Sequence, residues 1–143
     1  MVIEGMDFRE IDDFIAKWTD GGTFLEFFSK VYILLKQMPE TSLEFVGRPG
    51  VSYSLRPKHA SQKKRNLFAM IDVIDDDPTD RWLSVCFYED MITDPDHYGE
   101  CIPGGLAGSD GYCFDLNTPD PDRFEYIVTR LREAWSSAKE CRE

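Results

Sequence analysis

The chain has 143 residues, of which 42% are hydrophobic and 13% aromatic, and its formal net charge at pH 7 is −11. This length and composition predict a single domain over residues 1–143 and exclude a largely disordered chain. The acidic charge argues against nucleic-acid or anionic-membrane binding over the whole surface, so any such contact must use a local group of cations.

Two helices are predicted at the start of the chain, over residues 7–18 and 23–38. Apolar side chains recur in both at the spacing of one helical face, and the second helix is apolar over a broad stripe. Pro39 ends the second helix because proline lacks an amide hydrogen and blocks continuation. A helix as apolar as the second one is expected to pack in the core.

The middle of the chain predicts an antiparallel meander of four or five strands. The strands are expected at residues 43–46, 51–55, 67–74, 82–88 and 111–117. In the second of them, Ser52 and Ser54 alternate with apolar residues, which is typical of a strand with one face in water. The third is apolar at nearly every position and is therefore expected to be central. Residues 89–110 are rich in Gly, Pro and Asp and are predicted to be irregular.

The last helix is predicted over residues 121–138. Asp120 can cap it, Pro121 suits the first helical position, and apolar residues from Phe124 to Ala138 form one face. Together these elements predict an α+β fold, in which two N-terminal helices and one C-terminal helix pack on one face of the sheet.

Two segments carry a resemblance to a known group of proteins. The run from Lys64 to Ile71 resembles the entry to a central strand in MmcQ/YjbR-like and related small bacterial domains of unknown function. The run from Gly111 to Asn117, followed by the helix from Asp122, is similar to the closing strand and helix of that group. The resemblance covers roughly residues 43–138 and rests on element order and apolar spacing. It implies a sheet with helices on one face and a role in binding protein or nucleic acid.

A cluster of cations stands out in the acidic chain. Arg56, Lys58, Lys63, Lys64 and Arg65 lie within ten residues, together with His59 and without an acid; residues 56–65 are called the basic cluster below. Its local potential is opposite in sign to that of the whole chain and can attract an anion.

The leading functional hypothesis is a small binding module without catalysis. The basic cluster and the wet face of the sheet would hold an acidic protein or a single-stranded nucleic acid, with Tyr53 and His59 stacking on bases. The competing interpretation of the cluster is a solvated loop.

The alternative hypothesis is a small-molecule-binding protein or enzyme. The 89–111 loop would act as a lid over a pocket, with Asp96, His97 and Cys101 at its mouth. A concave pocket under this loop would favour the alternative, and a convex charged surface would favour the binding module.

No cofactor and no metal are expected. His97, Cys101 and Cys113 are possible zinc ligands, but their spacing is loose and a fourth ligand has no standard position. Cys86 lies in an apolar run, where a thiol behaves as a small hydrophobic group. No apolar run approaches the ~20 residues of a membrane span and no signal peptide is recognisable, so a cytoplasmic protein with reduced thiols is expected.

Overall fold

The computed structural model describes residues 7–141, and the helices and strands of this part follow the predicted order. The helices are α1 (Arg9–Lys17), α2 (Gly22–Gln37) and α3 (Pro121–Lys139), with a short 3-10 helix at Glu89–Met91. The strands are β1 (Thr41–Arg48), β2 (Ser52–His59), β3 (Met70–Ile74), β4 (Trp82–Phe87), β5 (Glu100–Leu106) and β6 (Ser109–Leu116).

All six strands form one antiparallel sheet in the order β1-β2-β3-β4-β6-β5. The first four strands are a simple meander, and β6 lies between β4 and β5. The predicted α+β class and antiparallel sheet are confirmed. The strand number is six because residues 100–106, predicted to be irregular, pair with β6.

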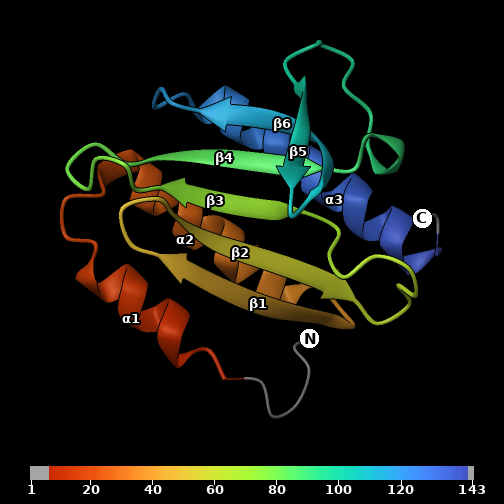
Figure 1. Cartoon of the computed structure of the whole chain (residues 1–143), viewed down its shortest axis with the longest axis horizontal. Helices are drawn as coiled ribbons and strands as arrows, with labels where there is room; N and C mark the ends of the chain where they lie inside the picture. Colours follow the sequence, from red (N-terminus) through yellow and green to blue (C-terminus); the bar gives the residue numbers. More distant parts are fainter. Residues whose placement is uncertain (1–6, 142–143) are drawn as a thin grey trace.

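One face of the sheet is covered by helices and holds the main core. Figure 1 shows α2 and α3 behind the sheet, on the side opposite to β5. Alternate strand residues such as Leu55, Ile71, Val85 and Phe114 point to this side and are almost completely buried. The apolar side chains that alternate along the strands thus pack against the apolar faces of the helices.

The start of α3 follows the sequence signals for a helix. The carboxylate of Asp120 accepts hydrogen bonds from the backbone N–H groups of Asp122 and Arg123, and Pro121 is the first helical residue. These contacts satisfy donors that the first turn of a helix leaves unpaired, which explains why the helix begins there.

The other face of the sheet, called the open face below, is crossed by the hairpin of β5 and β6. Figure 1 shows β5 in front of the other strands and at a steep angle to them. The turn residues Ala107 and Gly108 both have positive φ, as a two-residue hairpin turn requires. The pairing shifts between Ile102 and Leu106, and such irregularities bend a strand. The glycine-rich segment is therefore a bent hairpin rather than an irregular loop.

The bend brings Leu106 onto the open face, where its side chain is completely buried. It joins a second, smaller apolar cluster with Leu67, Met70, Cys86 and Cys113. This contact anchors the hairpin over the sheet and leaves space beside it.

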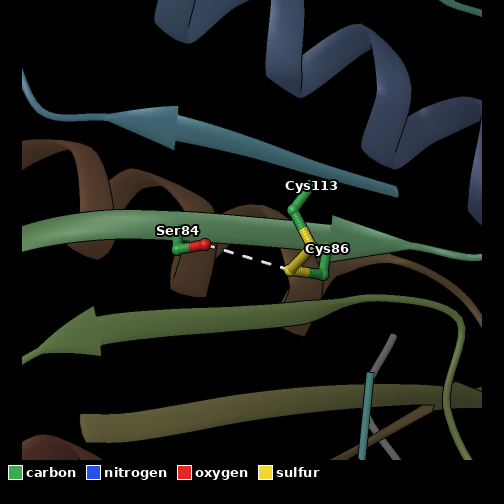
Figure 2. Close-up of a disulfide and its surroundings, with 3 residues drawn as sticks. All are labelled: Ser84, Cys86 and Cys113. Atoms are coloured by element: carbon green, nitrogen blue, oxygen red, sulfur yellow. Dashed lines mark hydrogen bonds between the residues drawn. A yellow bond between two sulfur atoms is a disulfide. The ribbon is translucent and has the colours of Figure 1, made fainter. Parts of the chain in front are cut away.

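Cys86 and Cys113 form a disulfide across neighbouring strands. They are directly paired in the register of β4 and β6, with Cα atoms 4.1 Å apart. Figure 2 shows the disulfide on the side of the sheet where Ser84 also lies, with the Ser84 hydroxyl 3.9 Å from Cys86 Sγ. The expectation of a reduced, purely packing Cys86 is therefore wrong. Cys101 and Cys141 are free and exposed.

Between residues 7 and 141, no helix is both long and apolar enough to cross a membrane.

Candidate functional site

A row of polar residues crosses the open face from strand to strand. Ser54 on β2 pairs with Asp72 on β3, Asp72 with Ser84 on β4, and Ser84 with Asp115 on β6. Residues paired in neighbouring strands point to the same face, so these four side chains lie side by side. Four neighbouring polar side chains beneath a hairpin that crosses the sheet make this part of the open face a candidate site.

The hairpin and the sheet border an open pocket with a volume of about 410 Å³, called the hairpin pocket below. It is lined by Asp72, Ser84, Cys86, Tyr98, Glu100, Ile102, Gly105, Cys113, Asp115, Asn117 and Arg123. Its floor is the sheet with the disulfide, one wall is β5, and Arg123 comes from the first turn of α3. A pocket of this size suits a small organic molecule.

Asp72 is the central residue of the floor. Its Oδ1 atom is buried and has no hydrogen-bond partner among residues 7–141. Burial raises the pKa of Asp72, while a hydrogen bond from Ser54 and the charges of Arg56 and Arg48 act in the opposite direction. A buried carboxylate oxygen without a partner costs free energy, so it needs an explanation other than stability.

Asp115 lies on the same row but at the exposed mouth of the pocket. Its carboxyl group is partly desolvated, which raises its pKa; Ser84 lowers this pKa through a hydrogen bond and the negative charge of Glu100 raises it. The pocket therefore contains three carboxylates and one guanidinium, that of Arg123.

A second pocket, called the arginine pocket below, lies on the open face and shares Asp72 and Gly105 with the first. Its volume is about 430 Å³, and it is lined by Arg48, Ser52, Arg56, Met70, Asp72, Gly104, Gly105, Ala107 and Gly108. The two pockets thus meet at Asp72, beneath the bent part of β5. Cations dominate the second pocket and anions the first.

Asp94 fixes the segment that leads into the hairpin. Its carboxylate accepts hydrogen bonds from the hydroxyls of Tyr112 and Tyr126 and from the backbone N–H groups of Tyr98 and Gly99. Burial raises the pKa of Asp94, but these four hydrogen bonds outweigh it and lower the pKa to about 2. A Cβ atom at Gly99 would lie only 2.1 Å from the Tyr112 ring, so glycine is required there. The network places Tyr98 at the pocket.

Replacing Asp94 with Asn should lower the free energy of unfolding by roughly 1–3 kcal/mol at pH 7, because an amide accepts these hydrogen bonds less strongly than a carboxylate. The carboxylate stabilises the fold fully above the pKa of an unfolded aspartate, and this contribution is lost as the pH falls from about 4 toward 2. Urea unfolding of both proteins across this range checks it. The control is Asp96→Asn, which changes an exposed neighbouring carboxylate and should have little effect on the free energy of unfolding. If Asp94→Asn were still less stable than the unmodified protein by the same amount at pH 2, the carboxylate would not be the source of the difference.

The structure divides the basic cluster. Arg56 faces the open side and lines the arginine pocket, where its Nε donates to Ser54 Oγ at 3.0 Å. Lys63 and Lys64 are exposed on the loop between β2 and β3, and Lys58 is half-buried near the end of β2. Arg65 binds the carboxylate of Asp90 through two hydrogen bonds, and its guanidinium lies 3.9 Å from the centre of the Tyr88 ring. Among residues 56–65, Arg56 alone lines the arginine pocket.

The two rings expected to stack on bases lie on the helix side. Tyr53 packs against Phe14 with ring centres 4.3 Å apart. His59 is only 3% exposed, its ring contacts Trp135, and its Nδ1 accepts a hydrogen bond from the N–H of Ser61. Burial also lowers the pKa of His59. Neither ring is placed to stack on a base at the open face, because β2 alternates its side chains between the two faces.

The residues predicted at the mouth of a lid-covered pocket do not line the hairpin pocket. Asp96, His97 and Cys101 are exposed, and β5 pairing places Cys101 opposite Tyr112, out of register with the pocket residues Glu100 and Ile102. Cys113 is bonded to Cys86 and cannot be a thiolate ligand together with His97 and Cys101. No group of three or more potential ligands from His, Cys, Asp and Glu in residues 7–141 is arranged to hold a metal ion.

Sequence reasoning missed Asp72, Ser84 and Asp115. One signal was present, because Asp72 is the only charged residue in the otherwise apolar run 67–74. A single charge inside a central strand has to be paired or functional.

Comparison with family models, with curated proteins and with solved structures finds no match to this chain. The resemblance to MmcQ/YjbR-like domains therefore stays a prediction.

Proposed function

We propose that this protein binds a small polar organic molecule in the hairpin pocket. The observation that carries the proposal is the unpartnered, buried Oδ1 of Asp72 on the floor of a 410 Å³ pocket. A ligand that donates a hydrogen bond to this oxygen would satisfy it, and the surrounding serines and carboxylates would fix the orientation of the ligand. This is the alternative hypothesis from the sequence, with β5 as the cover and with different residues at the site.

The proposal is for binding without catalysis. Neither of the two histidines, His59 and His97, lines the hairpin pocket, and both of its cysteines are in the disulfide. The pocket thus lacks the usual base and the free thiolate that nucleophilic catalysis would use.

The disulfide also bears on where the protein works. Disulfides persist in oxidising compartments and are rare in the cytosol. The Cys86–Cys113 bond therefore weighs against the cytoplasmic location expected from the sequence and favours an oxidising environment.

The role of Asp72 can be tested through stability and binding together. Asp72→Asn should raise the melting temperature by a few degrees at pH 7, because the raised pKa means that the ionised carboxylate is disfavoured in the fold. This gain should vanish below the ordinary pKa of an aspartate, at about pH 4, where wild-type Asp72 is protonated in both states. Retaining a residue that costs stability is typical of a functional site.

The binding measurement is an amide chemical-shift screen of the full chain against a library of small polar compounds. We expect shifts at Ser84, Gly105 and Asp115, which Asp72→Asn abolishes and the exposed-turn control Asp76→Asn preserves. A fall in melting temperature in Asp72→Asn, without any compound that shifts these amides, would assign Asp72 a structural role and end the proposal.

A second function, binding of an acidic protein or single-stranded nucleic acid through the basic cluster, is favoured by one observation. Lys63 and Lys64 are exposed next to each other on the loop after β2, on a chain whose net charge is otherwise strongly negative. An exposed pair of lysines can attract phosphates or carboxylates locally.

Replacing Lys63 and Lys64 with Ala should weaken binding to a fluorescent single-stranded oligothymidylate at low salt. Each lost phosphate contact should lower the slope of log affinity against log salt by about 0.7. Arg65 is left in place because it binds Asp90 and its loss would disturb the loop. The control removes Lys17 and Lys30, two exposed cations outside the cluster. Equal affinity and slope in the two double variants would eliminate this second function.

A further inference from the structure

The two pockets on the open face carry opposite charge. The hairpin pocket has three carboxylates, of Asp72, Glu100 and Asp115, against the guanidinium of Arg123, a formal balance of −2. The arginine pocket has Arg48 and Arg56 against the shared Asp72, a formal balance of +1. Because the pockets meet at Asp72, one molecule can extend from the negative side to the positive side.

We infer that the ligand of this site is zwitterionic, with a protonated amine held at Asp72 in the hairpin pocket and an anionic group held by Arg56 and Arg48. This inference rests on the proposed function, since it names the chemical class of the same ligand. The anionic group is a carboxylate or a phosphate, since each presents a pair of oxygen atoms that a guanidinium binds with two parallel hydrogen bonds.

The amine end follows from the partners that Asp72 lacks. The Ser54 hydroxyl accepts a hydrogen bond from Arg56 Nε and donates to the Asp72 carboxyl group, yet Oδ1 of Asp72 has no partner among the residues from 7 to 141. An ammonium group supplies three donors and a positive charge, so it satisfies this oxygen and offsets the charge of Asp115 and Glu100. A neutral donor would leave the excess negative charge of the pocket in place.

The anionic end follows from the arginine side chains. The nearest carboxylate to Arg56 is that of Glu44, and their closest atoms are 3.9 Å apart, which is beyond hydrogen-bond distance. Among residues 7–141, the terminal N–H groups of Arg56 therefore donate no hydrogen bond and are available to a ligand, and Arg48 is exposed beside the same pocket. Arg48, Arg56 and Asp72 line the same pocket, so one small molecule in it can contact both the carboxylate and the guanidinium groups.

The expected length of the ligand follows from the sheet. Asp72 lies on β3 and Arg48 on β1, with β2 between them and an offset of two residues along the strands, so their backbones are separated by roughly 12 Å. Both side chains extend into the space above the sheet, and four to six bonds between amine and anion fit the gap between them.

The experiment titrates the full chain with probes of matched size and follows the amide shifts of Ser84, Gly105 and Asp115. The zwitterions are 4-aminobutyrate, 6-aminohexanoate and 2-aminoethyl phosphate, and the singly charged or neutral controls are butylamine, butyrate and butanamide. We expect at least one zwitterion to bind about ten-fold more tightly than any control, since each charge-assisted contact is worth about that factor. The phosphate and carboxylate probes then distinguish the two anionic groups.

Variants locate the two ends of the ligand. Asp72→Asn should remove binding of both butylamine and the zwitterions, and Arg56→Gln should weaken binding of the zwitterions while leaving the affinity for butylamine unchanged. Arg132→Gln, an exposed arginine of α3 outside both pockets, should change nothing. If butyrate or butanamide bound as tightly as the zwitterions at these amides, the inference of a zwitterionic ligand would be wrong, but the proposed function would stand. The absence of any shift with every probe, and with the broader library above, would overturn both.

Discussion

Truncating Phe27 to Ala should lower the free energy of unfolding by about 3–5 kcal/mol. Phe27 is 2% exposed, and its ring stacks on that of Phe124 with centres 4.3 Å apart and planes at 7°. The contact joins α2 to α3 behind the sheet, so the cavity left by the truncation would lie between two well-packed helices that cannot easily close it.

Urea unfolding at pH 7 measures this loss, and Ile33→Ala is the matched control. Ile33 lies on the same helix but is 50% exposed, so its truncation should change the free energy of unfolding by no more than about 0.5 kcal/mol. Similar values for the two variants would show that α2 does not pack in the way described.

The helices and the central strands could be predicted because local pattern and tertiary packing agree in them. Apolar spacing placed α1, α2 and α3 within two residues of their observed bounds, and Asp120 caps α3 as expected. β5 could not be predicted in this way. Its segment contains Pro103, Gly104 and Gly105 and no alternating pattern, and it forms a strand only because β6 offers it hydrogen-bond partners.

The candidate site was largely hidden for a related reason. Asp72, Ser84 and Asp115 are far apart in sequence and lie side by side only because of how three strands pair. This register could not be predicted from the sequence. The same register pairs Cys86 with Cys113 across 27 residues. The unusual charge within the run 67–74 was visible, but nothing local indicated which partners would surround it.

The basic cluster illustrates the opposite difficulty. Its residues are neighbours in sequence, yet β2 turns Arg56 to the open face and His59 to the helix side, and Lys63 and Lys64 are exposed on the loop after β2. Residues that are close in sequence therefore do not form one binding surface here, because successive residues of a strand point to opposite faces.

Breaking the buried ion pair between Asp75 and Arg81 should have an effect as large as the loss of a core side chain. Asp75 is 2% exposed; its Oδ1 accepts from Arg81 Nε at 2.7 Å, and its Oδ2 accepts from the N–H of Gly50 at 2.8 Å. Arg81→Met leaves this carboxylate buried without its counter-charge, which should cost about 3–5 kcal/mol.

A second variant separates the charge from the packing. Adding Asp75→Asn to Arg81→Met removes the uncompensated charge and keeps an oxygen for Gly50, so the double variant should be clearly more stable than Arg81→Met alone. Asp80→Asn, in the exposed turn between β3 and β4, is the control and should lie within about 0.5 kcal/mol of the unmodified protein. Thermal and urea unfolding give these values, and a double variant less stable than Arg81→Met would show that the ion pair is not the source of the loss.

The ion pair also connects stability to the proposed site. Through Gly50, Asp75 fixes the turn between β1 and β2, and Arg48 of the arginine pocket is the last residue of β1 before that turn. If the turn loosens, Arg48 loses its fixed position beside Arg56 while Asp72 on β3 keeps its place. At a temperature where the variant is folded, Arg81→Met should therefore weaken binding of 4-aminobutyrate more than binding of butylamine. Equal weakening of the two probes would instead indicate a general loosening of the open face.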